Sequence, residues 1–503
     1  MKFILTLFIS LSIFQNAISQ NVVVGYKGGC HLTIKINNSK DTLAYLAYHF
    51  GDKEYIRDTT KIDKSGNFVF VREKPYEGGI YMFVTQDKRY FEFLLDKNQN
   101  FSIEANDPDF VTSAKFKTSP ENDLFFDYLR FTMKLGKSVD SLNSLINGTK
   151  DSIANKARKE TVKKSNQSVV DYRAKFQTDH PGSMLAMVFH AMQDVKIPEP
   201  PVDANGKTDS FFQYYYFKAH FWDNFDFHDS RILRTPVFAG KMKQYFSEQY
   251  MVQSPDSIIP AADALIAKAK SDSEIFKYVV ATLTYDYETN KIMGMDKVFV
   301  HLVEKYYMSN PRQDFWLDTA QHNKIVKRAQ TLSPLTLGNR GENIRLQDPN
   351  KNWVSLYEVP AKTTILIFYS PSCGHCQKVI PILRRVYHIY QKDGVEVYAV
   401  ATDTDEEEWK KFIEKDSLDW TNVMDAYHQY NFRQMYDVYA TPTMYVLDKD
   451  KHILGKRIGM GDLEGFLDHV MKLKDHPHAI TEKEKDELNK EQTTPVKEGE
   501  APK

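Results

Sequence analysis

Cysteine is scarce in this chain: only Cys30, Cys373 and Cys376 occur among its 503 residues. Exported proteins that depend on disulfides for stability carry a framework of cysteines, and three residues do not make one. Cys373 and Cys376 form a Cys-x-x-Cys pair, whereas Cys30 lies far upstream without a neighbouring partner. The pair is therefore better explained by redox chemistry than by structural cross-linking.

An excess of one sign of charge is also missing. The chain has 66 basic and 67 acidic residues, which gives a formal net charge of -1. This balance argues against the basic surface that nucleic-acid binding needs and against electrostatic attachment to an anionic membrane. Beyond the N-terminal segment, no run is long and apolar enough to cross a bilayer.

The N-terminal segment has the pattern of a signal peptide. Lys2 precedes a largely apolar run over residues 3–14, and the small residues of Ala17-Ile18-Ser19 follow. We therefore expect residues 1–19 to be removed before Gln20 and the mature chain to be exported to the periplasm. The run is too short to span a membrane, and no cysteine follows it closely, which argues against a lipid anchor.

The pattern of residues changes three times along the mature chain. Short alternating strands separated by turn signals predict a small antiparallel, all-β sandwich or barrel over residues 20–116. Charged amphipathic segments predict an α-helical domain over residues 117–333, opened by Ser119-Pro120. Alternating strands and helices predict an α/β domain over residues 334–475. The charged segment 476–503 has few apolar residues, and we expect it to be a disordered tail.

The α/β segment carries the motif Cys373-Gly374-His375-Cys376 between a predicted buried strand and a helix. Amides and the dipole at a helix N-terminus stabilise a thiolate on Cys373, and Cys376 lies one helical turn away. We expect Gly374 to permit a tight approach and a protonated His375 to favour the thiolate. Pro381 would kink the helix and orient its first turn.

A second element lies downstream, where Ala440-Thr441-Pro442-Thr443 precedes another predicted strand. An X-Pro bond at a strand entrance is a typical place for a cis peptide. We therefore predict a cis bond between Thr441 and Pro442.

Together these elements resemble the thioredoxin superfamily, and more closely its TlpA/ResA-like exported branch and AhpC/TSA relatives, over roughly residues 334–475. The resemblance implies a thiol–disulfide oxidoreductase in which Cys373 is the nucleophile and Cys376 resolves. It implies that Pro442 lies against the disulfide and that the backbone of Thr441 pairs with substrate. It also implies disulfide- or thiol-bearing client proteins, a membrane or periplasmic thiol electron donor, and neither cofactor nor metal.

Two features of this resemblance bear on chemistry. Ile367 and Val379 occupy positions where thioredoxin and ResA-like proteins keep a buried acid, so no general base carries over. The first two domains resemble the uncharacterised β and helical domains that precede the redox module in this branch. This leaves a second function open, a client-binding or envelope interaction protein in which the redox module is secondary.

Three alternative interpretations concern single motifs. The Cys-x-x-Cys pair could be half of a zinc site, with His388 as the nearest further ligand. The thioredoxin fold could keep its cysteines without using them. The aromatic stretch 214–229 could hold a metal on its polar residues His220, Asp226, His228 and Asp229, form a client groove, or pack a helical core.

Overall fold

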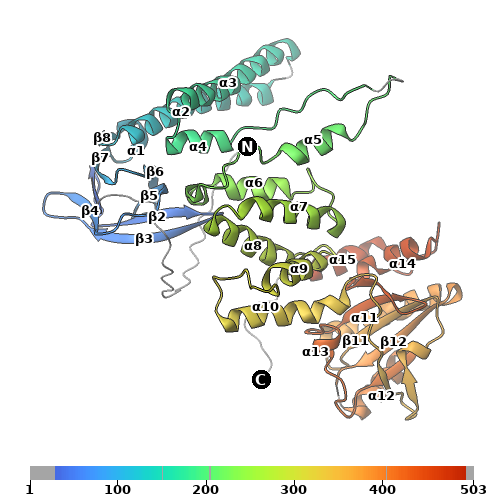
Figure 1. Ribbon diagram of the computed structural model, residues 1–503. Coiled ribbons are helices and arrows are strands. Elements are labelled where there is room, and N and C mark those ends of the chain that lie inside the picture. The colour runs from blue at the N-terminus through green and yellow to red at the C-terminus, as the bar shows by residue number, and fades with distance from the viewer. Residues whose placement is uncertain (1–28, 150, 203–205, 404, 494–503) are drawn as a thin grey trace. The chain divides into compact units, whose positions relative to one another are not determined.

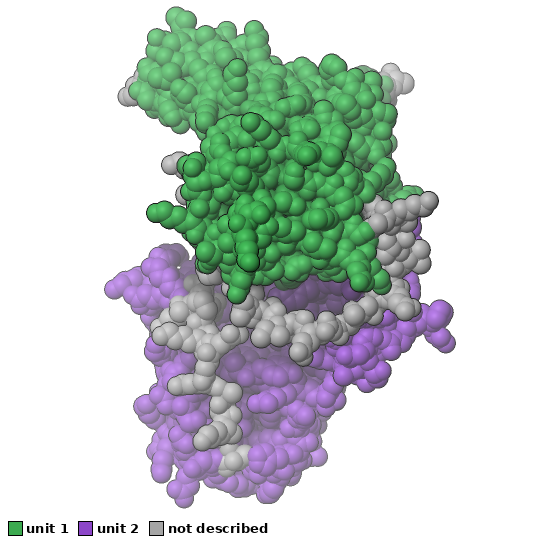
Figure 2. Space-filling model, turned by 90° about the vertical axis from the view of Figure 1, so that its left-hand side faces the viewer, with its two compact units in different colours: residues 1–243 green, residues 244–503 purple. Residues whose placement is uncertain are grey.

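The computed structural model describes residues 29–493 apart from positions 150, 203–205 and 404. The predicted signal peptide therefore lies outside the described residues. The chain divides into two compact units, residues 1–243 and 244–503 (Figure 2). This division differs from the expected boundaries, because it falls inside the predicted helical domain 117–333. No helix of the described part combines the length and apolar character that a membrane span needs.

The first unit contains two four-stranded sheets (Figure 1). One has the order β4-β1-β7-β8 and the other the order β3-β2-β5-β6. Their strands are β1 (Cys30–Asn37), β2 (Leu43–Phe50), β3 (Lys53–Lys61), β4 (Asn67–Arg72), β5 (Gly79–Thr85), β6 (Tyr90–Leu95), β7 (Asn100–Asn106) and β8 (Lys115–Lys117). The predicted β domain is confirmed, with one difference: β1 and β7 pair in parallel.

Helices complete this unit. They are α1 (Phe110–Ser113), α2 (Pro120–Gly148), α3 (Ser152–Asp179), α4 (Met184–Ala191), α5 (Phe212–His220), the short η1 (Ser230–Arg234) and α6 (Val237–Tyr245), which runs across the division between the units. Ser119 is the N-cap of α2 and Pro120 its first residue, as the sequence predicts. Phe125 and Phe126 of α2 are buried with strand residues in one core, so this helix is part of the β domain's packing.

The second unit begins with helices α7 (Pro255–Ala269), α8 (Ser273–Glu288), α9 (Asp296–Leu302), η2 (Val303–Tyr307), α10 (Thr319–Leu332) and η3 (Ser333–Leu335). A seven-stranded sheet follows in the order β10-β9-β13-β12-β11-β14-β15. Its strands are β9 (Arg345–Gln347), β10 (Trp353–Ser355), β11 (Thr363–Tyr369), β12 (Val395–Ala401), β13 (Thr421–Met424), β14 (Thr443–Asp448) and β15 (Ile453–Lys456).

Helices connect the strands of this sheet and follow its last strand. They are η4 (Leu356–Glu358), α11 (Gly374–Tyr390), η5 (Gln391–Asp393), α12 (Glu406–Asp416), α13 (Phe432–Met435), η6 (Met460–Asp462), α14 (Leu463–Met471) and α15 (Glu482–Thr493). The central strand β11 is buried along its whole length. Alternate residues of β11 enter two cores: Ile365 and Ile367 pack with α11 and α14, whereas Leu366 and Phe368 pack on the opposite face. The α/β prediction is thus confirmed.

The prediction of a disordered tail is wrong for residues 476–493. Helix α15 forms there, and Ile480 and Leu488 join the core that contains α11. The carboxylate of Glu464, itself buried, accepts hydrogen bonds from the backbone amides of Ala479 (2.6 Å) and Ile480 (3.0 Å). A few well-placed apolar residues and one carboxylate hold the segment, although its composition is polar overall.

Candidate active site

Strand β11 and helix α11 together position Cys373. The chain leaves the sheet at Tyr369, and Cys373 becomes the N-cap of α11. Its Sγ accepts a hydrogen bond from the amide of Cys376 at 3.5 Å. The thiol thus takes the place of an N-cap side chain, which accepts from an amide of the first helical turn. Cys373 is half-buried, and Cys376, one turn on, is fully buried. Both cysteines are free thiols in this structure.

The Thr441–Pro442 peptide is cis, as predicted. Because β11 and β14 run antiparallel with Phe368 opposite Thr443, the end of one strand lies beside the start of the other. The Cys373 thiol consequently donates to the carbonyl oxygen of Thr441 at 3.4 Å. Sheet pairing thus brings together the two motifs that the sequence keeps apart.

The two thiols differ in acidity. Burial opposes ionisation of Cys373, but hydrogen bonds from the Cys376 amide, the Thr441 side chain, the Cys376 thiol and the His375 amide outweigh it and lower the pKa. Donation to the Thr441 carbonyl favours the thiol, so the lowering is a net result. For Cys376, burial is the largest cause and raises the pKa to about 12. Of the pair, Cys373 is therefore the thiolate former.

The residues between and after the cysteines lie partly as expected. A Cβ atom built at Gly374 would meet no other atom of the described chain within 4 Å, so the expectation that Gly374 permits a tight approach stays a prediction. His375 is half-buried, and the contribution identified for it at Cys373 comes from its backbone amide. Pro381 lies within the second turn of α11.

A carboxylate that the sequence analysis missed lies next to the motif. Asp403 accepts hydrogen bonds from the hydroxyl of Ser370 at 2.6 Å and from that of Ser372 at 2.9 Å. It follows β12, which pairs in parallel with β11, so both strand ends reach the same sheet edge. The sequence contains a signal for this contact. Ser370 follows β11 and Asp403 follows β12, and polar residues that follow two neighbouring parallel strands are expected to lie close together. Ile367 and Val379 are both buried apolar residues of the core that contains α11.

A hollow of about 410 Å³ adjoins the motif. His375 and Val379 line it from α11, Pro442 from the cis-proline loop, and Arg457 from the end of β15. The remaining lining residues are Asp437, Tyr439, Ala440, Thr443, Met444, Ile458, Gly459 and Met460. A polypeptide segment approaching Cys373 beside Pro442 would meet this surface.

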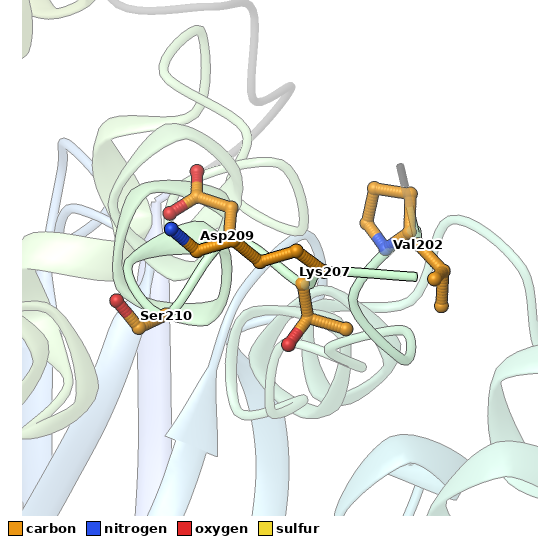
Figure 3. A pocket seen from close by; sticks show the side chains of 6 residues that line it. Val202, Lys207, Asp209 and Ser210 are labelled. Atoms are coloured by element: carbon orange, nitrogen blue, oxygen red, sulfur yellow. The ribbon is translucent and has the colours of Figure 1, made fainter. Parts of the chain in front are cut away.

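A second hollow lies away from the cysteines in sequence, in the loop before α5. Its described lining residues are Pro201, Val202, Lys207, Thr208, Asp209 and Ser210, shown as sticks in Figure 3. None of these side chains is a thiol or an imidazole. We therefore place the candidate chemistry at Cys373.

The alternative metal interpretations do not agree with the side-chain positions. His388 lies in the last turn of α11, at the end opposite to the cysteines, and binds Asp419 at 2.7 Å. In the aromatic stretch, His220 pairs with Asp223, His228 with Asp226, and Asp229 with Arg231, each within its own turn. The aromatic residues Trp222, Phe225 and Phe227 are buried together with Phe238, which indicates core packing.

Comparison with known proteins agrees with this arrangement. Residues 337–455 match the AhpC/TSA family, and residues 30–125 and 149–333 match two domains of unknown function, DUF4369 and DUF5106. A thiol-disulfide oxidoreductase ResA from Bacillus cereus is 27% identical over 139 residues, which cover 27% of this chain and 79% of that protein. ResA from Geobacillus kaustophilus gives the same identity and coverage.

A solved domain of a possible thiol-disulfide isomerase from Cytophaga hutchinsonii is 41% identical, with a TM-score of 0.27; the match covers 28% of this chain and 96% of that domain. The family match and the ResA relatives fall on the residues that form the seven-stranded sheet and its cysteine pair. The chain therefore carries a thioredoxin-like domain of the AhpC/TSA family, of the thiol-disulfide oxidoreductase class, behind two domains of unknown function.

Proposed function

We propose that this chain exchanges disulfides with client proteins through Cys373 and Cys376. The observation that carries the proposal is the unequal thiol pair at the start of α11, with the pKa of Cys373 lowered, that of Cys376 raised to about 12, and the cis Thr441–Pro442 peptide beside them. A thiolate is the attacking species in disulfide exchange. The more acidic, more accessible sulfur is therefore the nucleophile.

The reaction proceeds in two exchanges. The Cys373 thiolate attacks a client disulfide, forms a mixed disulfide and releases one client sulfur as a thiolate, which takes up a proton. Cys376 then loses its proton and attacks the Cys373 sulfur, which forms the Cys373–Cys376 disulfide and releases the second client thiol. The client gains two electrons and two protons. A thiol donor, in the membrane or the periplasm, restores the dithiol; run in reverse, the same steps donate a disulfide.

Location in the periplasm is part of this proposal. It rests on Lys2, the apolar residues 3–14 and Ala17-Ile18-Ser19. Mass spectrometry of the mature protein is expected to find Gln20 at the N-terminus and the protein in the periplasmic fraction. Retention of Met1 on most molecules would contradict export with cleavage.

Insulin reduction with dithiothreitol as donor tests the activity. Wild type is expected to accelerate precipitation of the insulin B chain, and Cys373→Ser is expected to lose this acceleration while it keeps the fold by circular dichroism. Cys376→Ser is expected to accumulate a mixed disulfide, visible as an adduct on non-reducing gels. Equal rates of insulin precipitation for wild type and Cys373→Ser would contradict the proposed oxidoreductase activity. They would favour the alternative function, a client-binding envelope protein.

A further inference from the structure

The hollow beside Pro442 has an apolar floor and one charged wall. Val379, Met444 and Met460 form the floor, and each is at most 4% exposed. The wall is Arg457, which follows β15 and whose side chain is 54% exposed. Its backbone has a left-handed φ of 54°, and its amide donates to the carbonyl of Met444 at 2.6 Å. The backbone of Arg457 is thus held against β14, and its half-exposed side chain lines the hollow.

A single buried carboxylate holds this arginine. Asp437, with a side chain 1% exposed, accepts from the guanidinium of Arg457 and also from that of Arg328. Arg328 comes from α10, outside the residues that match the AhpC/TSA family, and lies 4.0 Å from Glu288. Asp437 accepts from the Nη2 atom of Arg457, on one side of the guanidinium, while the Arg457 side chain stays 54% exposed. The exposed face of that group keeps donors for another anion.

We propose that Arg457 recognises a carboxylate, from an aspartate or glutamate that lies close to the reacting cysteine of the client. The inference deepens the proposed function and rests on it. A client strand beside Thr441 places its cysteine at Cys373 and sends flanking side chains into the adjoining hollow. There the apolar floor takes aliphatic atoms and the guanidinium takes the carboxylate, in the geometry that arginine forms with carboxylates. Arg328 and Asp437 act as positioning residues.

Fluorogenic disulfide peptides test this preference. Each peptide carries Asp at one of the positions within three residues of its cysteine, and a matched peptide carries Asn. For wild type we expect kcat/KM to be about two- to fivefold higher for Asp than for Asn at one or two positions, since a half-exposed ion pair gives an effect of this size. The preference is expected to shrink as sodium chloride is raised from low to high concentration.

Two substitutions of Arg457 test whether this residue causes the preference for Asp over Asn. Arg457→Gln is expected to bring the Asp-to-Asn ratio close to one, and Arg457→Lys to keep part of it. Arg345→Gln is the matched control, because Arg345 is exposed at the far side of the same sheet, on β9. It is expected to keep the wild-type ratio.

The outcomes separate this inference from the proposed function. Binding of the same peptides to Cys373→Ser, followed by fluorescence anisotropy, reads the preference without turnover. Absence of any Asp preference in wild type, or its persistence in Arg457→Gln, overturns the carboxylate subsite while reduction itself stands. Absence of reduction of every peptide overturns the proposed function, and the binding ratio then still decides the subsite. If Arg457→Gln does not fold, a salt-independent preference in wild type overturns the role of charge.

Discussion

The Sγ atom of Cys373 lies 3.4 Å from the carbonyl oxygen of Thr441, across 68 positions of the sequence. The antiparallel pairing of β11 with β14 creates this contact, because the C-terminal end of one strand meets the N-terminal start of the other. The reactive sulfur and the segment that would pair with a client are therefore fixed by the same two central strands. Rigid strands hold a site more closely than loops do.

Alkylation by iodoacetamide is expected to distinguish the three cysteines of the reduced protein. The pKa of Cys373 lies below the ordinary thiol value, so its alkylation should reach half its maximal rate at a lower pH than that of a free thiol. Burial raises the pKa of Cys376 to about 12 and that of Cys30 to about 11, so both should stay largely unmodified near neutral pH. Peptide mapping by mass spectrometry measures each site. Faster labelling of Cys376 than of Cys373 would reverse the assigned roles.

Substitutions at His375 separate its backbone from its ring. The amide of residue 375 helps to lower the pKa of Cys373. His375→Pro removes that N–H at a position where the first helical turn accepts proline, so the Cys373 pKa should rise and the redox potential become more reducing. His375→Ala keeps the N–H and should shift both less. Sites with Gly-Pro and Gly-His differ by roughly 90 mV between thioredoxin and disulfide isomerase.

Equilibration with glutathione measures the potentials of these two variants, and the pH dependence of alkylation measures the thiol pKa. The expected order is His375→Pro most reducing, then His375→Ala, then wild type. If His375→Ala shifts the potential as far as His375→Pro, the imidazole rather than the amide sets the poise.

Leu488→Ala is expected to lower the free energy of unfolding of the second unit by about 2 kcal/mol, because Leu488 of α15 is buried in the core with α11. For a unit of this size the melting temperature should fall by about 4–8 °C. Glu487→Ala, at an exposed position of the same helix, is the control and should cost less than about 0.5 kcal/mol. Equal stability of Leu488→Ala and wild type in thermal and urea unfolding would mean that α15 does not dock in solution.

Cys30→Ala is expected to leave insulin turnover unchanged. Cys30 is 1% exposed in the core of the first unit, and burial raises the pKa of its thiol, so it behaves as a small apolar residue. Loss of the buried sulfur should lower the stability of that unit by about 1 kcal/mol. Turnover reduced as severely as in Cys373→Ser would instead give Cys30 a redox role.

Much of the site could be predicted because its signals are local. The helix that follows the cysteine motif, the buried strand before it and the X-Pro strand entrance each depend on neighbouring residues, and the structure contains all three. Local patterns gave the wrong prediction for the tail, because only a few of its residues are buried. The apolar contacts of Ile480 and Leu488 outweigh its polar composition.

The cysteine pair could be read from local sequence, because two cysteines one helical turn apart at a helix N-terminus receive amides that favour a thiolate. The groups around that thiolate, by contrast, come together only when the whole chain folds. The pairing of Asp403 with Ser370 and Ser372, and the sharing of Asp437 between Arg328 and Arg457, join residues from separate elements. Such contacts depend on strand order and side-chain packing, which no short stretch of sequence encodes. The same reason explains why α15 docks: Glu464 and the amides of Ala479 and Ile480 meet only after the chain has folded.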